Sequence, residues 1–189
     1  MTAAARTKSF DELYREIRDL PEGSRGEILE PGKLHVMGRP GKRHRRAAQA
    51  IHVQLSGADQ GTVGSGWWIE IEPEVRFGER LLDPDLAGWR VDRVAELPDE
   101  NPIDIVPDWV CEVMSPSTAV TDVRLKLPVY ARAGVSFIWY VDPENRLVQV
   151  FAPESGKPAL IATASDEGTV RLPPFDLDIS PQRWWIAKP

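Results

Sequence analysis

The sequence is poor in the residues that build cross-links and zinc sites, since it has 1 cysteine, Cys111, and 3 histidines. A single cysteine excludes an internal disulfide, so the reducing cytoplasm is the compartment that we expect. Cys111 lies in an apolar stretch, where we expect an inert, buried thiol. No histidine or cysteine pair has the spacing of a zinc site. No glycine-rich loop matches a nucleotide-binding pattern, so we expect no nucleotide cofactor.

Long apolar runs are also missing. No stretch approaches the length needed to cross a bilayer, and the N-terminus lacks an apolar signal region, so we expect no membrane partner. The content of 42% hydrophobic and 28% charged residues is typical of a folded chain. A length of 189 residues allows a substantial core. We therefore expect one domain that spans residues 1–189.

An excess of positive charge is the third feature that is lacking, because the formal net charge is -6. A protein that binds nucleic acid mainly through its phosphates is usually basic, so this balance argues against tight duplex binding. Acidic residues are also what a divalent-cation site requires, with basic groups confined to a local patch. Net charge alone leaves both interpretations open.

The apolar pattern predicts helices and hairpins around a central sheet. Ser9 and Glu12 form a capping-box pattern at the start of a short helix. The other predicted elements are a hairpin over 26–38, a helix over 42–55, an alternating run over 67–77 with a turn near Gly78, a strand over 109–114, a helix from 117 or 118 to 133 with a kink at Pro128, a hairpin over 135–153, and strands near 159–163 and 169–172. This order indicates an α/β or α+β domain with mixed strand directions.

Glu112 is unusual within the strand "WVCEVM", because both faces of that strand are otherwise apolar. Asp85 occupies a similar place at the end of an apolar run in "LLDPDLAG". Two carboxylates on neighbouring strands repel unless a proton or a cation lies between them, and Mg²⁺ is typically bound by one or two carboxylates. The alternatives are a turn aspartate for Asp85 and a buried ion pair with an arginine for Glu112.

Lys126 lies four residues after Asp122 on one face of the predicted helix that follows this strand. One interpretation is a surface ion pair between the two side chains. The other is that the helix returns Lys126 to the carboxylates, where its ammonium stabilises charge on a phosphate.

A basic run, "GKRHRR", opens the predicted helix over 42–55. Cations near a helix start oppose the macrodipole, so Arg43, Arg45 and Arg46 have no local stabilising role there. A phosphate partner accounts for them, which predicts nucleic-acid contact, while a solvated face is the alternative. His44 is a candidate for contact with a phosphate or a metal site, and a structural role is its alternative.

Most of the chain resembles the Uma-type putative restriction endonuclease family of the PD-(D/E)XK superfamily. The similar segments are "GEILEPGKL" with the following histidine, "DPDLAGWR", "PDWVCEVMSPST", the aspartate and lysine of "TDVRLK", "YARAGV", "WYVDP" and the closing "WW". The resemblance implies a restriction-endonuclease-like core, with a central mixed sheet flanked by helices. It also implies a divalent cation, Mg²⁺ or Mn²⁺, and hydrolysis of phosphodiester bonds.

The resemblance assigns roles residue by residue. Asp85 matches the motif aspartate, Glu112 the motif acid, Lys126 a lysine on the following helix, and Glu27 an N-terminal glutamate that can join the site. The superfamily lysine expected two residues after the acid is absent, because Met114 occupies that position. We therefore expect Lys126 to take its place.

The predicted function is a metal-dependent endonuclease that cleaves DNA and forms a homodimer. Its metal would be held by Asp85, Glu112 and the carbonyl of Val113. Trp184 and Trp185 fit an apolar dimer interface and core packing equally well. The alternatives are a non-catalytic module on the same fold that binds nucleic acid or protein, and a metal-dependent hydrolase of RNA or another phosphoester.

Overall fold

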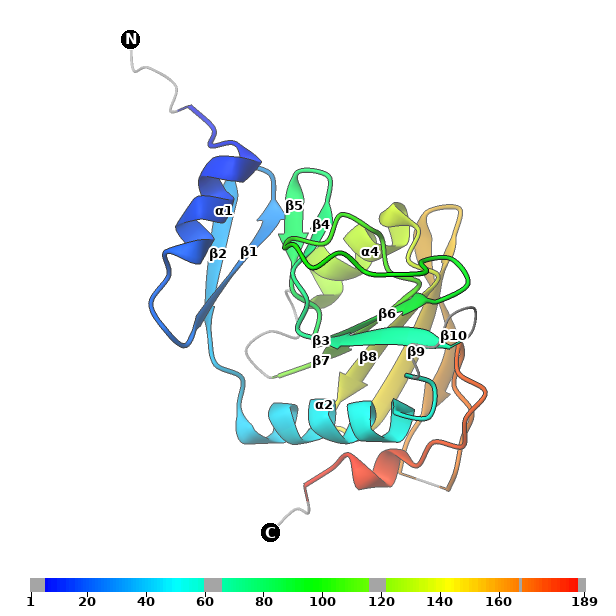
Figure 1. Ribbon diagram of the computed structural model, residues 1–189. Coiled ribbons are helices and arrows are strands. Elements are labelled where there is room, and N and C mark those ends of the chain that lie inside the picture. Colours follow the sequence, from blue (N-terminus) through cyan, green and yellow to red (C-terminus); the bar gives the residue numbers. More distant parts are fainter. Residues whose placement is uncertain (1–5, 60–65, 116–121, 167, 187–189) are drawn as a thin grey trace.

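The computed structural model describes residues 6–59, 66–115, 122–166 and 168–186, and within these residues the strands form two sheets (Figure 1). The small sheet has the order β2-β1-β5-β4, with strands β1 (Ser24–Glu30), β2 (Lys33–Gly38), β4 (Val75–Phe77) and β5 (Arg80–Leu82). The large sheet has the order β10-β9-β8-β7-β6-β3, with strands β3 (Trp67–Ile71), β6 (Leu86–Arg90), β7 (Trp109–Val113), β8 (Phe137–Asp142), β9 (Leu147–Glu154) and β10 (Lys157–Ala164).

The large sheet is mixed, because β7 and β8 are parallel while its other neighbouring strands are antiparallel. The parallel pair is joined by a crossover that contains a π-helical turn, η1 (Asp122–Lys126), and the helix α4 (Leu127–Ala133). This arrangement confirms the mixed strand directions expected from the sequence.

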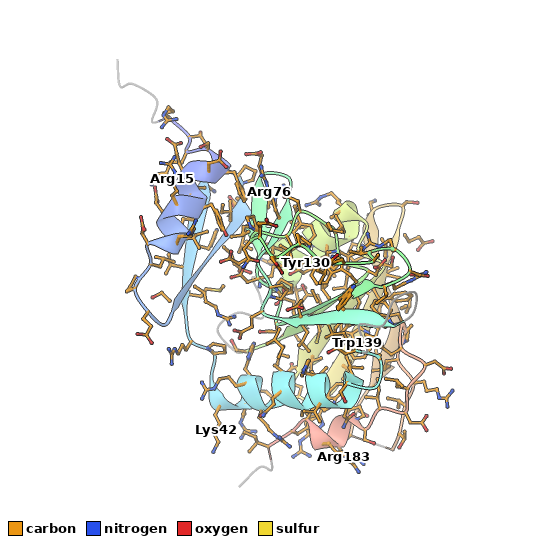
Figure 2. All side chains as sticks on the ribbon, viewed as in Figure 1. Arg15, Lys42, Arg76, Tyr130, Trp139 and Arg183 are labelled. Atoms are coloured by element: carbon orange, nitrogen blue, oxygen red, sulfur yellow. The ribbon has the colours of Figure 1, made fainter. Side chains whose placement is uncertain are left out.

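Two helices cover the two faces of the large sheet (Figure 1). On one face, α2 (Lys42–Leu55) packs against alternate residues of β7 and β8, including Cys111 and Trp139. On the other face, α4 packs against β8 and contributes Tyr130 (Figure 2). Burial raises the pKa of the Cys111 thiol well above its usual value, which fits the inert thiol predicted from the sequence.

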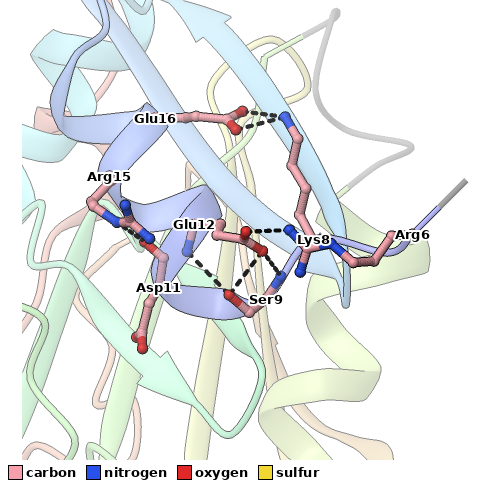
Figure 3. A network of polar contacts seen from close by, with 7 residues as sticks. All are labelled: Arg6, Lys8, Ser9, Asp11, Glu12, Arg15 and Glu16. Atoms are coloured by element: carbon pink, nitrogen blue, oxygen red, sulfur yellow. Dashed lines mark hydrogen bonds and ion pairs between the residues drawn. The ribbon is translucent and has the colours of Figure 1, made fainter.

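The first helix, α1 (Phe10–Arg18), lies against the hairpin of β1 and β2 (Figure 1). Its start is fixed by the predicted capping box, in which Ser9 Oγ accepts from the N–H of Glu12 and the Glu12 carboxylate accepts from the N–H of Ser9 (Figure 3). Lys8 pairs with Glu16 on the same exposed surface.

The alternating run predicted over 67–77 is not one strand. β3 ends at Ile71, and Glu72 has a φ of 54°, a left-handed conformation that turns the chain out of the large sheet and into the small one. The predicted turn near Gly78 does join β4 and β5. The strand predicted near 169–172 is wrong, because only an isolated bridge between Val170 and Ile179 forms there.

The helix predicted from 117 or 118 to 133 is described only from Asp122 onward, since residues 116–121 lie outside the described part. A π-helical turn, rather than a kinked α-helix, precedes Pro128, and Gly134 ends α4 with a φ of 88°, as predicted.

Trp184 and Trp185 follow the short 3-10 helix η2 (Pro181–Arg183) and are buried in the core on the α2 side of the large sheet. Trp184 stacks on Trp139 with ring centroids 6.4 Å apart. Their burial favours core packing over a dimer interface.

Across the described ranges, no helix combines the length and the apolar character that are needed to cross a membrane.

Candidate active site

The pairing of β6 with β7 brings Asp85 and Glu112 to one region, as expected from the sequence. Leu86 is the partner of Cys111 in this antiparallel pair, so Asp85, directly before β6, lies beside the end of β7. The backbone N–H of Val113 donates to Asp85 Oδ2 at 2.7 Å. Both carboxylate residues are buried, with exposed fractions of 5% for Asp85 and 3% for Glu112.

Glu112 is held by two donors from the crossover helix. Lys126 Nζ lies 3.2 Å from Glu112 Oε2, and the Tyr130 hydroxyl donates to Glu112 Oε1 at 2.5 Å. Lys126 is buried, with an exposed fraction of 4%, so it is not part of a surface ion pair. The side chain of Asp122 lies outside the described residues. The buried partner of Glu112 is therefore a lysine, in place of the arginine that we considered.

Glu27 joins the same network from β1 of the small sheet. Its side chain is fully buried, and its Oε1 lies 2.9 Å from Lys126 Nζ and accepts from the N–H of Asp83 at 2.9 Å. Among the residues that the structure describes, none forms a hydrogen bond with the second oxygen of Glu27. Lys126 thus bridges two carboxylates that belong to different sheets, Glu27 and Glu112.

The first turn of α2 brings only one of its predicted residues to the carboxylates. His44 Nε2 lies 3.0 Å from Asp85 Oδ2. Arg43 forms an ion pair with Glu144 at 3.3 Å, while Arg45 and Arg46 are exposed and bond the backbone carbonyls of Pro40 and Arg183. None of these three arginines lines the cavity that contains Asp85.

That cavity has a volume of about 500 Å³ and walls from both sheets. It is lined by the predicted site residues Asp85, Glu112, Val113, His44 and Lys126. It is also lined by three residues that the sequence did not single out, Asp83, Arg25 and Arg39. Asp83 lies two residues before Asp85. Burial and the nearby charge of Glu27 raise the pKa of Asp83 to about 8.

Tyr130 is a further residue that the sequence analysis missed. It follows Lys126 by four residues, and this spacing places two side chains on one face of a helix. The same spacing rule that linked Asp122 to Lys126 could therefore have found Tyr130. Burial and the charge of Glu112 raise the pKa of the Tyr130 hydroxyl well above its usual value, so it stays a donor.

The oxygen donors in this cavity fit a hard divalent cation. Within the described residues, no group of three or more histidine, cysteine, aspartate and glutamate side chains is arranged to hold a metal. Two carboxylates, Asp85 and Glu112, do line one cavity. Mg²⁺ typically uses one or two carboxylates, with water and substrate phosphate completing its shell, so this donor set is compatible with Mg²⁺ or Mn²⁺ and unlike a zinc site.

A mixed sheet flanked by helices, with two carboxylates at the ends of central strands and a lysine from the crossover beside them, is the arrangement of a restriction-endonuclease-like protein. The chain belongs to the Uma2 family, described as "Putative restriction endonuclease", whose model matches residues 10–181. None of the proteins with curated descriptions matches it.

A solved structure supports the fold assignment. It is described as a putative nuclease belonging to DUF820 from Anabaena variabilis. The similarity has a TM-score of 0.71 at 20% sequence identity and covers 94% of this chain and 97% of that chain. Family and fold together indicate nuclease chemistry, which is hydrolysis of phosphodiester bonds.

Proposed function

We propose that the protein is an endonuclease that hydrolyses DNA with Mg²⁺ or Mn²⁺. The observation that carries this proposal is the convergence of Asp85, Glu112 and Lys126 in one cavity. We also propose that residues 1–189 act as one domain, because the cavity takes its walls from both sheets. The chain acts as a homodimer in this proposal, since two sites address the two strands of a duplex.

Asp85, Glu112 and the carbonyl of Val113 would hold the cation. When bound, Mg²⁺ or Mn²⁺ polarises the phosphate and lowers the pKa of a nearby water. The N–H of Val113 and the hydroxyl of Tyr130 keep the two carboxylates in place. Their hydrogen bonds leave further lone pairs on the carboxylate oxygens for the cation.

Lys126 supplies positive charge where negative charge develops on the phosphate in the transition state. Its contacts with Glu27 and Glu112 hold the ammonium at the inner end of the cavity. His44, 3.0 Å from Asp85, would orient that carboxylate or contact the phosphate. Arg43, Arg45 and Arg46 would contact phosphates outside the cavity, along the first turn of α2.

The test is a cleavage assay on supercoiled plasmid, single-stranded DNA and RNA, each with Mg²⁺, Mn²⁺ or EDTA. We expect cleavage of plasmid with either metal and none with EDTA. Cleavage of RNA without cleavage of either DNA would show that the substrate is RNA and not DNA. No cleavage of any substrate would refute the nuclease proposal and favour a non-catalytic binding module.

A further inference from the structure

The cavity also has a basic wall, formed by Arg25 of the small sheet and Arg39 of the segment that leads to α2. Arg25 and Glu27 are two residues apart in β1, so their side chains lie on the same face of the strand. Glu27 is buried against Lys126, while Arg25 lines the cavity. Met37 pairs with Arg25 across the hairpin and also lines the cavity. Arg39 lines it from the segment between β2 and α2.

Both arginines have weak partners in the protein. Arg25 pairs with Glu72, and the exposed fractions of these side chains are 25% and 41%. Arg39 lies 3.7 Å from Glu22, and both side chains are largely exposed. Ion pairs at such exposure contribute little to stability, so a stronger anion can displace the glutamates. A phosphate is such an anion, because a guanidinium can bind it with two parallel hydrogen bonds.

We propose that Arg25 and Arg39 form a phosphate-binding site within the cavity, which holds a backbone phosphate next to the one that is cleaved. The site gives the acidic cavity a region where a polyanion is attracted rather than repelled. The identity of that polyanion as a nucleic acid rests on the proposed function. The anion site itself rests on the geometry of the basic wall.

Glu72 competes with the phosphate for Arg25 in this arrangement. The position of Glu72 is fixed, because its N–H donates to the Asp85 carbonyl at 3.0 Å. Removing its charge should therefore free Arg25 and strengthen phosphate binding. If the ion pair between Arg25 and Glu72 only stabilised the fold, removing Glu72 would weaken phosphate binding, as removing Arg25 does.

Binding is measured by fluorescence anisotropy of a short labelled DNA duplex in EDTA, over a series of salt concentrations. For the double variant Arg25→Gln with Arg39→Gln, we expect affinity to fall about tenfold for each arginine. The slope of log affinity against log salt should fall by roughly 1 for each arginine. The control Arg90→Gln with Arg171→Gln has the same charge change outside the cavity and should stay close to wild type.

Two further measurements decide the inference. Glu72→Gln should raise duplex affinity, by about threefold or more, while Arg25→Gln lowers it. Titration with inorganic phosphate should detect binding to the wild type that the double variant loses. Equal duplex and phosphate binding by wild type and double variant, or no binding of either probe, would overturn the inference. Binding without metal-dependent cleavage would instead refute the proposed nuclease function and leave the anion site intact.

Discussion

Replacing Lys126 with methionine should destabilise the protein strongly when no metal is present. Lys126 Nζ lies 2.9 Å from Glu27 Oε1 and 3.2 Å from Glu112 Oε2, and all three residues are buried. Removing the ammonium leaves two buried carboxylates without this cation. Breaking a buried ion pair costs about 3–5 kcal/mol, so we expect a loss of that size in the free energy of unfolding.

The measurement is thermal unfolding in EDTA. For a chain of this length each kcal/mol shifts the Tm by roughly 2–4 °C, so Lys126→Met should lower it by roughly 10 °C. Adding Glu27→Gln removes one of the two buried carboxylate charges and should restore part of that loss. Lys157→Met, at an exposed position on β10, is the control and should stay within about 0.5 kcal/mol of wild type.

A second effect of Lys126→Met should appear in catalysis. We expect cleavage under metal saturation to slow by about a hundredfold or more, because the charge acts in the transition state. If Lys126→Met unfolds at the Tm of the Lys157→Met control in EDTA, the buried bridge between Glu27 and Glu112 does not stabilise the fold as described. Cleavage at the wild-type rate would refute the catalytic role.

The remaining predictions concern the carboxylates and their donors. Asp85→Asn and Glu112→Gln should each weaken Mn²⁺ binding at least about tenfold in calorimetry, since each removes one charged ligand, and unchanged affinity in both would refute the shared site. Asp83→Asn tests the pKa of about 8. The folded state keeps a proton that the unfolded state loses near pH 4, so wild type should lose stability as pH rises from about 4 to about 8. Asp83→Asn in EDTA should lack that loss, and parallel curves would contradict the raised pKa. Tyr130→Phe should lower the free energy of unfolding by about 2 kcal/mol, because it removes a buried hydrogen bond to Glu112, and an unchanged Tm would contradict this.

Glu112 was predictable because its strand is simple. A lone acid in a strand that is apolar on both faces needs a partner wherever the strand lies, so Glu112 stands out from the local sequence alone. For Lys126 the local sequence left two interpretations open, a surface ion pair with Asp122 and a return to the carboxylates, and the family resemblance favoured the second. Only the inference for Glu112 uses short-range geometry alone.

The basic wall was not predictable in the same way. Arg25 and Arg39 line the same cavity as the carboxylates only because segments far apart in the sequence come together there, and that approach is not encoded in local periodicity. The left-handed conformation of Glu72, which sends the chain from one sheet to the other, gave no signal either, since its neighbours continue the alternating pattern. The role of the buried Trp184 stayed ambiguous, because tryptophan suits a core and an interface equally well.

The most direct test of the account is the rate of plasmid cleavage by wild type and Glu112→Gln, purified in parallel and assayed with Mn²⁺. Glutamine keeps the shape of the side chain and can still contact Tyr130, but it removes the charge that would hold the cation. We predict metal-dependent cleavage by the wild type and a rate at least about a hundredfold lower for Glu112→Gln. Equal rates for the two proteins, or no cleavage by the wild type, would contradict the assignment of this cavity as a metal-dependent nuclease site.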